Sequence, residues 1–278
     1  MTLSVNTNVA AMVALQNLNG STRELEVTQN RVSTGLKVIG AKDNSAVYAI
    51  AQGMRADIGA MTAVTASLNR AKSITDVALA AGESISDLLV QMKEKAIAAN
   101  DASIDTTARA ALNEDFRSLR SQIATIVQNA KFDGANLIDG SLTSGLQMLA
   151  DADATSAITL TPENMSVSGS IVTITSTTAL TSLAASSTAL GLVNSSLQNV
   201  NSALARLGSV GKKVDSHIIF VGKLSDALTG GVGNLVDADM AVESARLQAL
   251  QIKQQLGSQA VSIANSAPQI ILSLFRGG

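Results

Sequence analysis

The chain has 278 residues, a formal net charge of −2 and no cysteine. These values exclude disulfides, thiolate metal sites and cysteine nucleophiles, and the interspersed charges offer no basic surface for nucleic acid. Apolar residues make up 46 % of the sequence but aromatic residues only 2 %, whereas enzyme cores and pockets usually depend on large aromatics. The composition therefore favours long helices packed side by side over a globular enzyme.

The first expected helix covers Val5 to Val32. We expect no cleaved signal peptide, because the N-terminal residues lack a basic region followed by a continuous apolar core. No window approaches the roughly 18 consecutive apolar residues of a membrane span, so no membrane insertion is expected. The helix carries an apolar stripe, broken by Thr22 and Gln29, that consists of Ala11, Leu15, Leu18, Leu25 and Val32.

A glycine-punctuated stretch, residues 33–50, is expected to be an irregular connector. A heptad pattern then runs from Met61 to Ala99 and predicts a helix about 58 Å long. After a turn at residues 100–105, a second periodic run at residues 108–130 predicts an antiparallel partner helix.

The sequence changes character after KFDGANLIDG, and residues 155–196 are rich in serine and threonine. Alternating apolar and polar residues predict a short hairpin around a Pro162–Asn164 turn, the alternative being an irregular polar loop. Helical periodicity returns at Leu197, with Ser195 and Gln198 spaced as a capping box. The stretch LTGGVGNLVDAD is expected to be a hinge before the last helix.

The last forty residues carry a narrow apolar seam, which cannot be buried without a partner helix. The opposite terminus is the obvious partner, and self-association with other copies is expected from the remaining apolar surface. The alternative is an intramolecular bundle that binds nothing. The seam advances in steps of three and four residues through Ala238, Val242, Ala245, Ala249, Ile252, Leu256, Ala260, Ile263, Ala267, Ile270 and Leu274.

The fold class expected from these patterns is mainly α. Long antiparallel helices form a coiled-coil rod in which the N- and C-terminal helices pair outside and the inner helices pair within. A small β-hairpin or sheet lies in the middle of the chain, and we expect it to emerge at the end of the rod remote from the paired termini.

Few residues suggest chemistry. Asp237, Asp239 and Glu243 form a DxDxxxE pattern typical of hard-cation ligands, but capping of a helix start explains the same residues. His217 is the lone histidine and has no second histidine to form a metal site. The glycines at 230, 231 and 233 lack the spacing of a phosphate loop. We therefore expect no catalytic residues, no cofactor and no metal.

Four stretches resemble bacterial flagellin: NTNVAAMVALQNLNGS, RVSTGLKVIGAKDNSAVYAIAQGMRADI, FDGANLIDG and the C-terminal NLVDADMAVESARLQALQIKQQLGSQAVSIANSAPQIILSLFR. The resemblance covers about 140 residues at the start and 80 at the end, in the right order. The short middle, together with LAAGESISDLLVQMKEKA and HIIFVGKLSDAL, is most like the short flagellins of stalked alphaproteobacteria.

The resemblance implies a self-assembling structural subunit of the flagellar filament that serves motility outside the cell. It implies export in an unfolded state by the flagellar type III apparatus, an export chaperone, and folding at the filament tip beneath a cap, next to hook-junction proteins. Family members order their terminal segments on assembly. The hydroxyl-rich middle offers acceptor sites for O-linked glycans, as in some flagellins.

We accordingly expect residues 1–44 and 237–278 to form a terminal coiled-coil domain. Residues 45–140 and 197–236 form a helical rod domain, and residues 141–196 form a small outer segment. The polymer interface is expected on the terminal seams, at Leu15, Leu18, Leu25, Val32, Val242, Leu256, Ile263, Ile270 and Leu274. The competing functions are a hook-filament junction protein and a soluble coiled-coil adaptor.

Overall fold

The computed structural model describes the backbone of residues 7–276 and the side chains of residues 7–266. The chain divides into two compact units. A terminal unit comprises residues 1–56 and 227–278, and a central unit comprises residues 57–226. No helix in the described part of the chain has the length and apolar character needed to cross a membrane. The elements, in chain order, are α1 (Val9–Thr34), α2 (Ser45–Ala99), α3 (Thr106–Asn129), β1 (Leu146–Leu149), β2 (Ala157–Leu160), α4 (Leu183–Val236) and α5 (Met240–Arg276).

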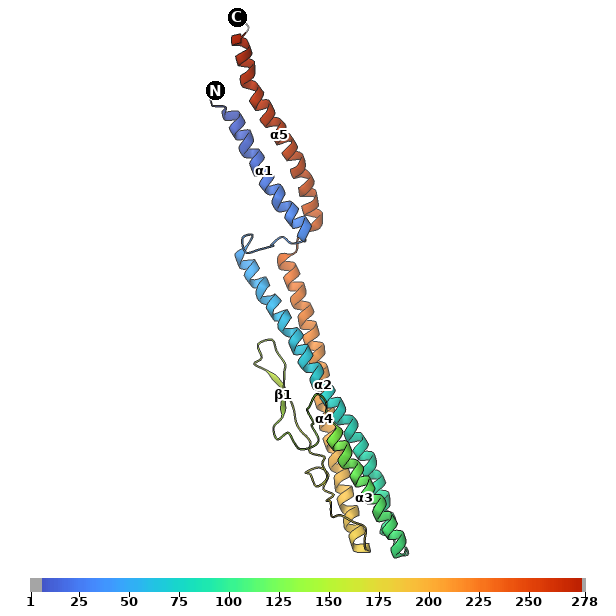
Figure 1. The fold of residues 1–278 in the computed structure, drawn as a ribbon. Helices are drawn as coiled ribbons and strands as arrows, with labels where there is room; N and C mark the ends of the chain where they lie inside the picture. Colours follow the sequence, from blue (N-terminus) through green and yellow to red (C-terminus); the bar gives the residue numbers. More distant parts are fainter. Residues whose placement is uncertain (1–6, 277–278) are drawn as a thin grey trace. The chain divides into compact units, whose positions relative to one another are not determined.

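In the terminal unit, α1 and α5 lie side by side, and α5 continues past the start of α1 (Figure 1). Asn8 caps α1 by accepting a hydrogen bond from the Ala11 amide. Gly35 ends the helix with φ +72°, a left-handed conformation that favours glycine, and its amide donates to the Arg31 carbonyl. Both helix ends are therefore fixed by local sequence.

The two connectors of the terminal unit pair with each other. The Lys37 amide donates to the Val236 carbonyl at 2.7 Å, and the Ala238 amide donates to the Gly35 carbonyl at 2.8 Å. The connector before α2 and the connector before α5 thus form an isolated antiparallel bridge. Because the bridge satisfies backbone groups of both connectors, it holds the C-terminal end of α1 beside the N-terminal end of α5.

The central unit is built on α3 and on the parts of α2 and α4 within residues 57–226, and both α3 and α4 run antiparallel to α2. Lys72 pairs with Asp215 and Ser86 lies against Asn201, so α2 and α4 run in opposite directions. Lys95 pairs with Asp115 across the turn from α2 to α3. The predicted seam of α2 is buried along its whole length. Its large members include Met61, Leu68, Ile85, Leu89 and Met92.

A non-helical segment, residues 130–182, packs beside these helices. It opens with a two-residue Asp133–Gly134 turn closed by paired hydrogen bonds between Phe132 and Ala135. The buried Asn136 then donates to the Val127 carbonyl. The strands β1 and β2 form an antiparallel pair in the register Leu146 to Leu160. The predicted fold class, long antiparallel helices with one small hairpin, is therefore confirmed.

The predicted bounds of the inner helices need correction. The helix α2 begins at Ser45, inside the expected connector, and α4 begins at Leu183 and continues through the glycine-rich stretch to Val236. The predicted capping box at Ser195 therefore lies inside a helix, and the hinge shrinks to residues 237–239. Each glycine costs a helix only about 1 kcal/mol relative to alanine, so a helix held by other contacts continues through Gly230, Gly231 and Gly233.

The hairpin also differs from expectation. Its turn is formed by residues 150–156 instead of Pro162–Asn164, which follow β2. The Leu149 amide donates to Ser67 Oγ, and His217 Nε2 lies 2.6 Å from the Ala150 carbonyl oxygen. These contacts place the hairpin against the sides of α2 and α4 and not at the end of the rod. The physical reason is that the segment contains apolar side chains, among them Ile158, Met165 and Ile174, that require cover.

Candidate self-association surface

The helices α1 and α5 pack through a heptad seam that mixes aliphatic, small and polar residues. Leu25 and Leu250 are its buried large side chains, at 6 % and 2 % exposure. Leu18 fits against Gly257, where an added Cβ would lie 3.1 Å from Leu18 Cδ1. The least exposed residues recur every three or four positions. On α1 they are Ala11, Ala14, Leu18, Ser21, Leu25, Thr28 and Val32, and on α5 they are Glu243, Leu247, Leu250, Gln254, Gly257, Val261 and Ala264.

Polar contacts fix the register of this pair at both ends. Asn8 Nδ2 donates to the Ala264 carbonyl at 2.7 Å, at the far end of the pair. At the base, Arg31 Nη1 lies 3.1 Å from Glu243 Oε1. Because a heptad slip would break both contacts, they specify one alignment where the small seam residues alone would not.

The predicted C-terminal seam faces away from α1. Val242 is 60 % exposed, Leu256 65 % and Ile263 63 %. The expectation that the two ends of the chain pair is confirmed, but α5 uses a different face for that pairing. Helical periodicity puts the buried and exposed positions on opposite sides of the helix. We call the exposed set the α5 stripe, consisting of Val242, Ala245, Ala249, Ile252, Leu256 and Ile263.

The predicted N-terminal residues divide differently. Leu18, Leu25 and Val32 lie in the seam with α5, whereas Leu15 is 49 % exposed. Ile270 and Leu274 lie beyond the residues whose side chains the structure describes. The sequence reasoning overlooked the exposed Val9, Met12 and Val13 in the first turns of α1. The sequence could have indicated them, because the first turns of α1 are apolar on all sides and have more apolar surface than one partner helix can cover.

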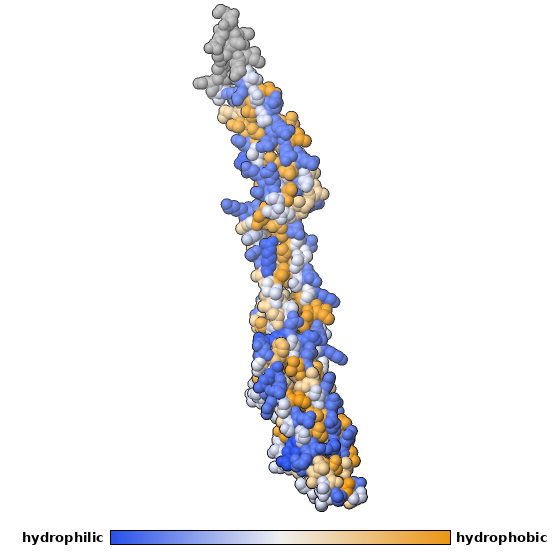
Figure 2. Space-filling view, turned by 45° about the vertical axis from the view of Figure 1, so that its right-hand side comes forward, coloured by the Kyte–Doolittle hydropathy of each residue, from blue (hydrophilic) through white to orange (hydrophobic). Residues whose placement is uncertain are grey.

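An open apolar groove of about 640 Å³ runs between the first turns of α1 and the middle of α5. Val9 and Val13 form one wall, and Leu256 and Ala260 form the other. Figure 2 shows hydrophobic side chains at the surface among hydrophilic ones over the terminal helices. Exposed apolar surface of this extent and regularity is typical of an interaction site.

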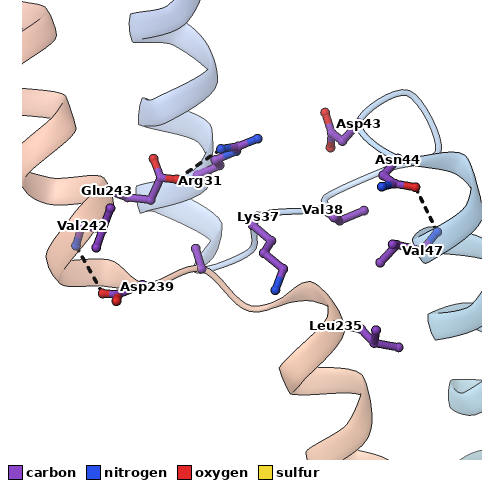
Figure 3. Close-up of a pocket in the computed structure, with 11 residues that line it drawn as sticks. Arg31, Lys37, Val38, Asp43, Asn44, Val47, Leu235, Asp239, Val242 and Glu243 are labelled. Atoms are coloured by element: carbon purple, nitrogen blue, oxygen red, sulfur yellow. Dashed lines mark hydrogen bonds and ion pairs between the residues drawn. The ribbon is translucent and has the colours of Figure 1, made fainter.

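A second cavity, of about 450 Å³, lies at the base of the helix pair (Figure 3). We call it the basal cleft. Arg31 and Glu243 meet at one side, and Asp43 and Asn44 lie on the other. Amides of Ile39 and Gly40 donate to the Asp43 carboxylate, and these bonds, helped by the charge of Arg31, lower the pKa of that carboxyl.

The arrangement has no catalytic character. Asp239 accepts from the Ala241 and Val242 amides as a helix cap, and Glu243 is committed to Arg31. Within the described residues, no three histidine, cysteine or acidic side chains are close enough to hold a metal ion. His217 is bonded to a backbone carbonyl, and its ring centre lies 5.7 Å from that of Phe220 at a tilt of 40°. What the site offers is a pair of aligned helices with an unpartnered apolar face.

Two family models match the chain: the bacterial flagellin N-terminal helical region at residues 5–143, and the bacterial flagellin C-terminal helical region at residues 190–275. The chain is a member of the bacterial flagellin family. This flagellin is 50 % identical over 273 residues to flagellin FljK of Caulobacter vibrioides, with 98 % of both chains covered. It is 38 % identical over 283 residues to a flagellin of Brucella melitensis, with 99 % of both chains covered.

Among solved structures, this flagellin resembles one described as a flagellar hook-associated protein from Vibrio parahaemolyticus. The TM-score is 0.58 at 12 % identity, with 70 % of this chain and 100 % of that chain covered. That likeness shows the fold alone. The identity of 48–50 % to proteins named flagellin, over nearly the whole length of both chains, supports the filament subunit among the expected functions.

Membership of the family establishes the general function of the chain. This flagellin is a structural subunit of the extracellular flagellar filament and serves motility. It polymerises with copies of itself. The family is one of structural proteins and not of enzymes.

Proposed function

We propose that the α5 stripe and the exposed first turns of α1 form the lattice contacts of the filament. The observation that carries this proposal is the exposure of Val242, Leu256 and Ile263 on the face of α5 opposite its partner helix. The backbone of α5 continues through Arg276, so Ile270 and Leu274 extend the same stripe by their spacing. Leu15 contributes from α1.

Leu18, Leu25 and Val32 contribute to the lattice indirectly, without contacting another subunit. Their place in the α1–α5 seam means that they hold the two helices in the alignment that presents both exposed surfaces together. The exposed apolar side chains of the α5 stripe make no stabilising contacts until another subunit covers them. The terminal segments, residues 1–44 and 237–278, therefore become fully ordered as a domain when subunits meet.

The rest of the chain forms the rod and the outer segment of the subunit. Residues 45–140 and 197–236 form the helical rod, and residues 141–196 form the outer segment, with its non-helical part ending before Leu183. The serines and threonines of that segment offer sites for O-linked glycans. The chain travels unfolded through the flagellar type III apparatus with an export chaperone, without loss of a signal peptide, and folds beneath the filament cap.

Seeded polymerisation tests the lattice contact. Leu256→Asp should raise the critical concentration more than a hundredfold, because a carboxylate buried in an apolar contact costs several kcal/mol at every subunit. Gln255→Asp is the matched control, since it adds the same charge at an exposed neighbour off the stripe. Electron microscopy should show filaments from the control only. Normal filaments from Leu256→Asp would refute the placement of the contact on this stripe.

The export proposal has an independent test. Mass spectrometry of filaments sheared from cells should show an intact N-terminal segment, because no cleavage is proposed. Limited proteolysis should remove both terminal segments from soluble subunits and spare them in filaments. A shortened N-terminus in filaments would contradict uncleaved export, and equal protection in the two states would contradict ordering on assembly.

A further inference from the structure

Asn19 and Gly20 lie in the middle of α1 and form the single Asn-Gly pair of the chain. The side chain of Asn19 is exposed, and within the described residues its amide makes no hydrogen bond. A Cβ added at Gly20 would meet nothing within 4 Å, so packing does not require glycine there. Glycine also costs a helix about 1 kcal/mol relative to alanine. The packing of α1 therefore gives no reason for this pair.

An asparagine followed by glycine loses its side-chain amide without an enzyme. The backbone nitrogen of Gly20 attacks Cγ of Asn19, the bond from Cγ to the side-chain nitrogen breaks, and ammonia leaves. Water then opens the resulting five-membered succinimide at either carbonyl, which gives aspartate or isoaspartate. One water is consumed and one ammonia is released. Glycine favours ring closure because it has no side chain to hinder its nitrogen and allows a wide range of backbone angles.

The closed helix prevents this reaction. As an interior residue of α1, Gly20 donates its amide to the carbonyl four residues earlier. Helical backbone angles also hold its nitrogen away from Cγ of Asn19. Ring closure therefore requires both the release of that hydrogen bond and a rotation about ψ of Asn19. The rate of the reaction follows how often this turn of α1 opens.

Few contacts of the single chain hold this turn of α1 closed. Leu25 and Thr28 are the buried residues of α1, and both lie C-terminal to the pair. On the N-terminal side, Val9, Met12 and Val13 are exposed. Local stability increases with buried apolar surface. The turn therefore opens more often in a soluble subunit than in one whose outer α1 surface is covered.

We propose that Asn19 deamidates spontaneously whenever α1 is open, and that isoaspartate at this position keeps the modified subunit out of the filament. Isoaspartate puts one extra carbon into the main chain, which interrupts the hydrogen-bonded ring of the helix and changes the register across position 19. Leu18 and Leu25 lie on opposite sides of that position, so they no longer fit the α5 seam together. The difference between soluble subunits and filaments rests on the proposed ordering of the terminal segments.

Peptide mapping by mass spectrometry tests the modification. The wild-type chain is incubated at mildly alkaline pH as unfolded chain in urea, as soluble subunit and as filament. Deamidation of Asn19, mostly to isoaspartate, should be fastest in urea and at least about tenfold slower in filaments, since an opening free energy of about 1.4 kcal/mol already gives that factor. Gly20→Ala is the matched control, because its Cβ has space in the folded chain but hinders the attacking nitrogen. Equal rates in urea and in filaments, or for Gly20→Ala and the wild type in urea, would overturn the proposal.

The soluble subunit separates this proposal from the ordering of the terminal segments. A rate in soluble subunits between those in urea and in filaments would support both proposals. Protection as strong in soluble subunits as in filaments, together with fast reaction in urea, would support the control of Asn19 by α1 and contradict ordering on assembly.

Seeded polymerisation tests the exclusion of modified subunits. Wild-type chain is aged in urea, refolded and seeded, and isoaspartate at position 19 should be at least about tenfold depleted in the filament pellet relative to the supernatant. Gly20→Ala aged in the same way carries the same damage at other asparagines and should polymerise normally.

Asn19→Asp isolates the effect of the carboxylate, because it adds the charge without the extra backbone carbon. Arg23 Nε already donates to the Asn19 carbonyl at 3.3 Å, so a basic group lies one turn away to pair with the new aspartate. This variant should polymerise like the wild type. Equal isoaspartate in pellet and supernatant would overturn the exclusion, and a loss of filaments from Asn19→Asp would mean that charge and not backbone length is responsible, against the proposal.

Discussion

The close approach of α1 and α5 at Gly257 gives the sharpest test of the helix pair. A Cβ at Gly257 would lie 3.1 Å from Leu18 Cδ1 and 3.8 Å from Leu18 Cα, so Leu18 or α1 must shift to admit the side chain of Gly257→Leu. Overpacking of this kind costs about 1–3 kcal/mol. Gly20→Leu is the matched control, since a Cβ at Gly20 meets nothing within 4 Å.

Both variants replace a helical glycine by the same residue, so the gain in helix propensity of roughly 1 kcal/mol is common to them. The difference between them isolates the contact with Leu18, and 1–3 kcal/mol corresponds to about a 5- to 150-fold difference in critical concentration. Seeded polymerisation measures it, and amide hydrogen exchange of α1 in the filaments shows whether the helix has loosened. Leu18→Ala should restore most of the loss in Gly257→Leu, because it removes the opposing side chain.

Two results would refute this reasoning. Equal critical concentrations for Gly257→Leu and Gly20→Leu would mean that the two helices do not approach closely at this point. A loss in Gly257→Leu that Leu18→Ala does not reduce would mean that the larger side chain disturbs something other than α1.

Three further predictions concern other parts of the chain. Arg206→Ala should lower the free energy of unfolding by about 1–2 kcal/mol in urea titration, because it leaves the buried Glu163 without the two bonds, 2.6 and 2.7 Å, that Arg206 now donates. The amide bonds from Ile39 and Gly40 lower the pKa of Asp43 in the folded state, so the stability that they contribute is fully present above pH 3.8, the ordinary pKa, and is lost as pH falls through the lowered pKa. Hydrogen exchange of these connector amides should accelerate in that pH range, and less so in Asp43→Asn. A short polar peptide inserted between Asp153 and Ala154, in the exposed hairpin turn, should leave filaments intact and bind antibody along their length; filaments that hide the peptide would contradict an outer position.

Composition would favour an insertion between Ser186 and Ser187 instead, because the residues around them are the richest in serine and threonine. The structure puts Ser186 inside α4 with no exposed surface. Hydroxyl density is a poor guide here, because serine and threonine in a helix can bond to the preceding turn, as Thr188 does to the Ala184 carbonyl. Composition therefore did not predict that α4 begins at Leu183.

The sequence was most reliable along the inner helices. The heptad from Met61 to Ala99 is buried throughout the central unit, and the turn and helix that follow it lie where periodicity predicts them. A heptad seam of this length admits few other packings, since a rotation of α2 would expose Leu68 or Ile85 to water. The Asp-Gly turn and the glycine cap at Gly35 are equally local, because each depends on a backbone conformation that few residues adopt.

By itself the sequence determined that the two ends of the chain are helices with one apolar face each, that they pair, and that apolar surface remains for other subunits. It did not determine which face pairs. Apolarity favoured the face with Val242, Leu256 and Ile263, but α1 packs on the opposite face, where the small Gly257 permits close approach and Arg31 bonds Glu243. That choice depends on contacts between residues more than 200 positions apart, whose complementarity exists only once both helices are placed. A hydrophobic pattern reports how much surface must be covered, whereas tertiary structure decides which part is covered within the chain and which part is left for the next subunit.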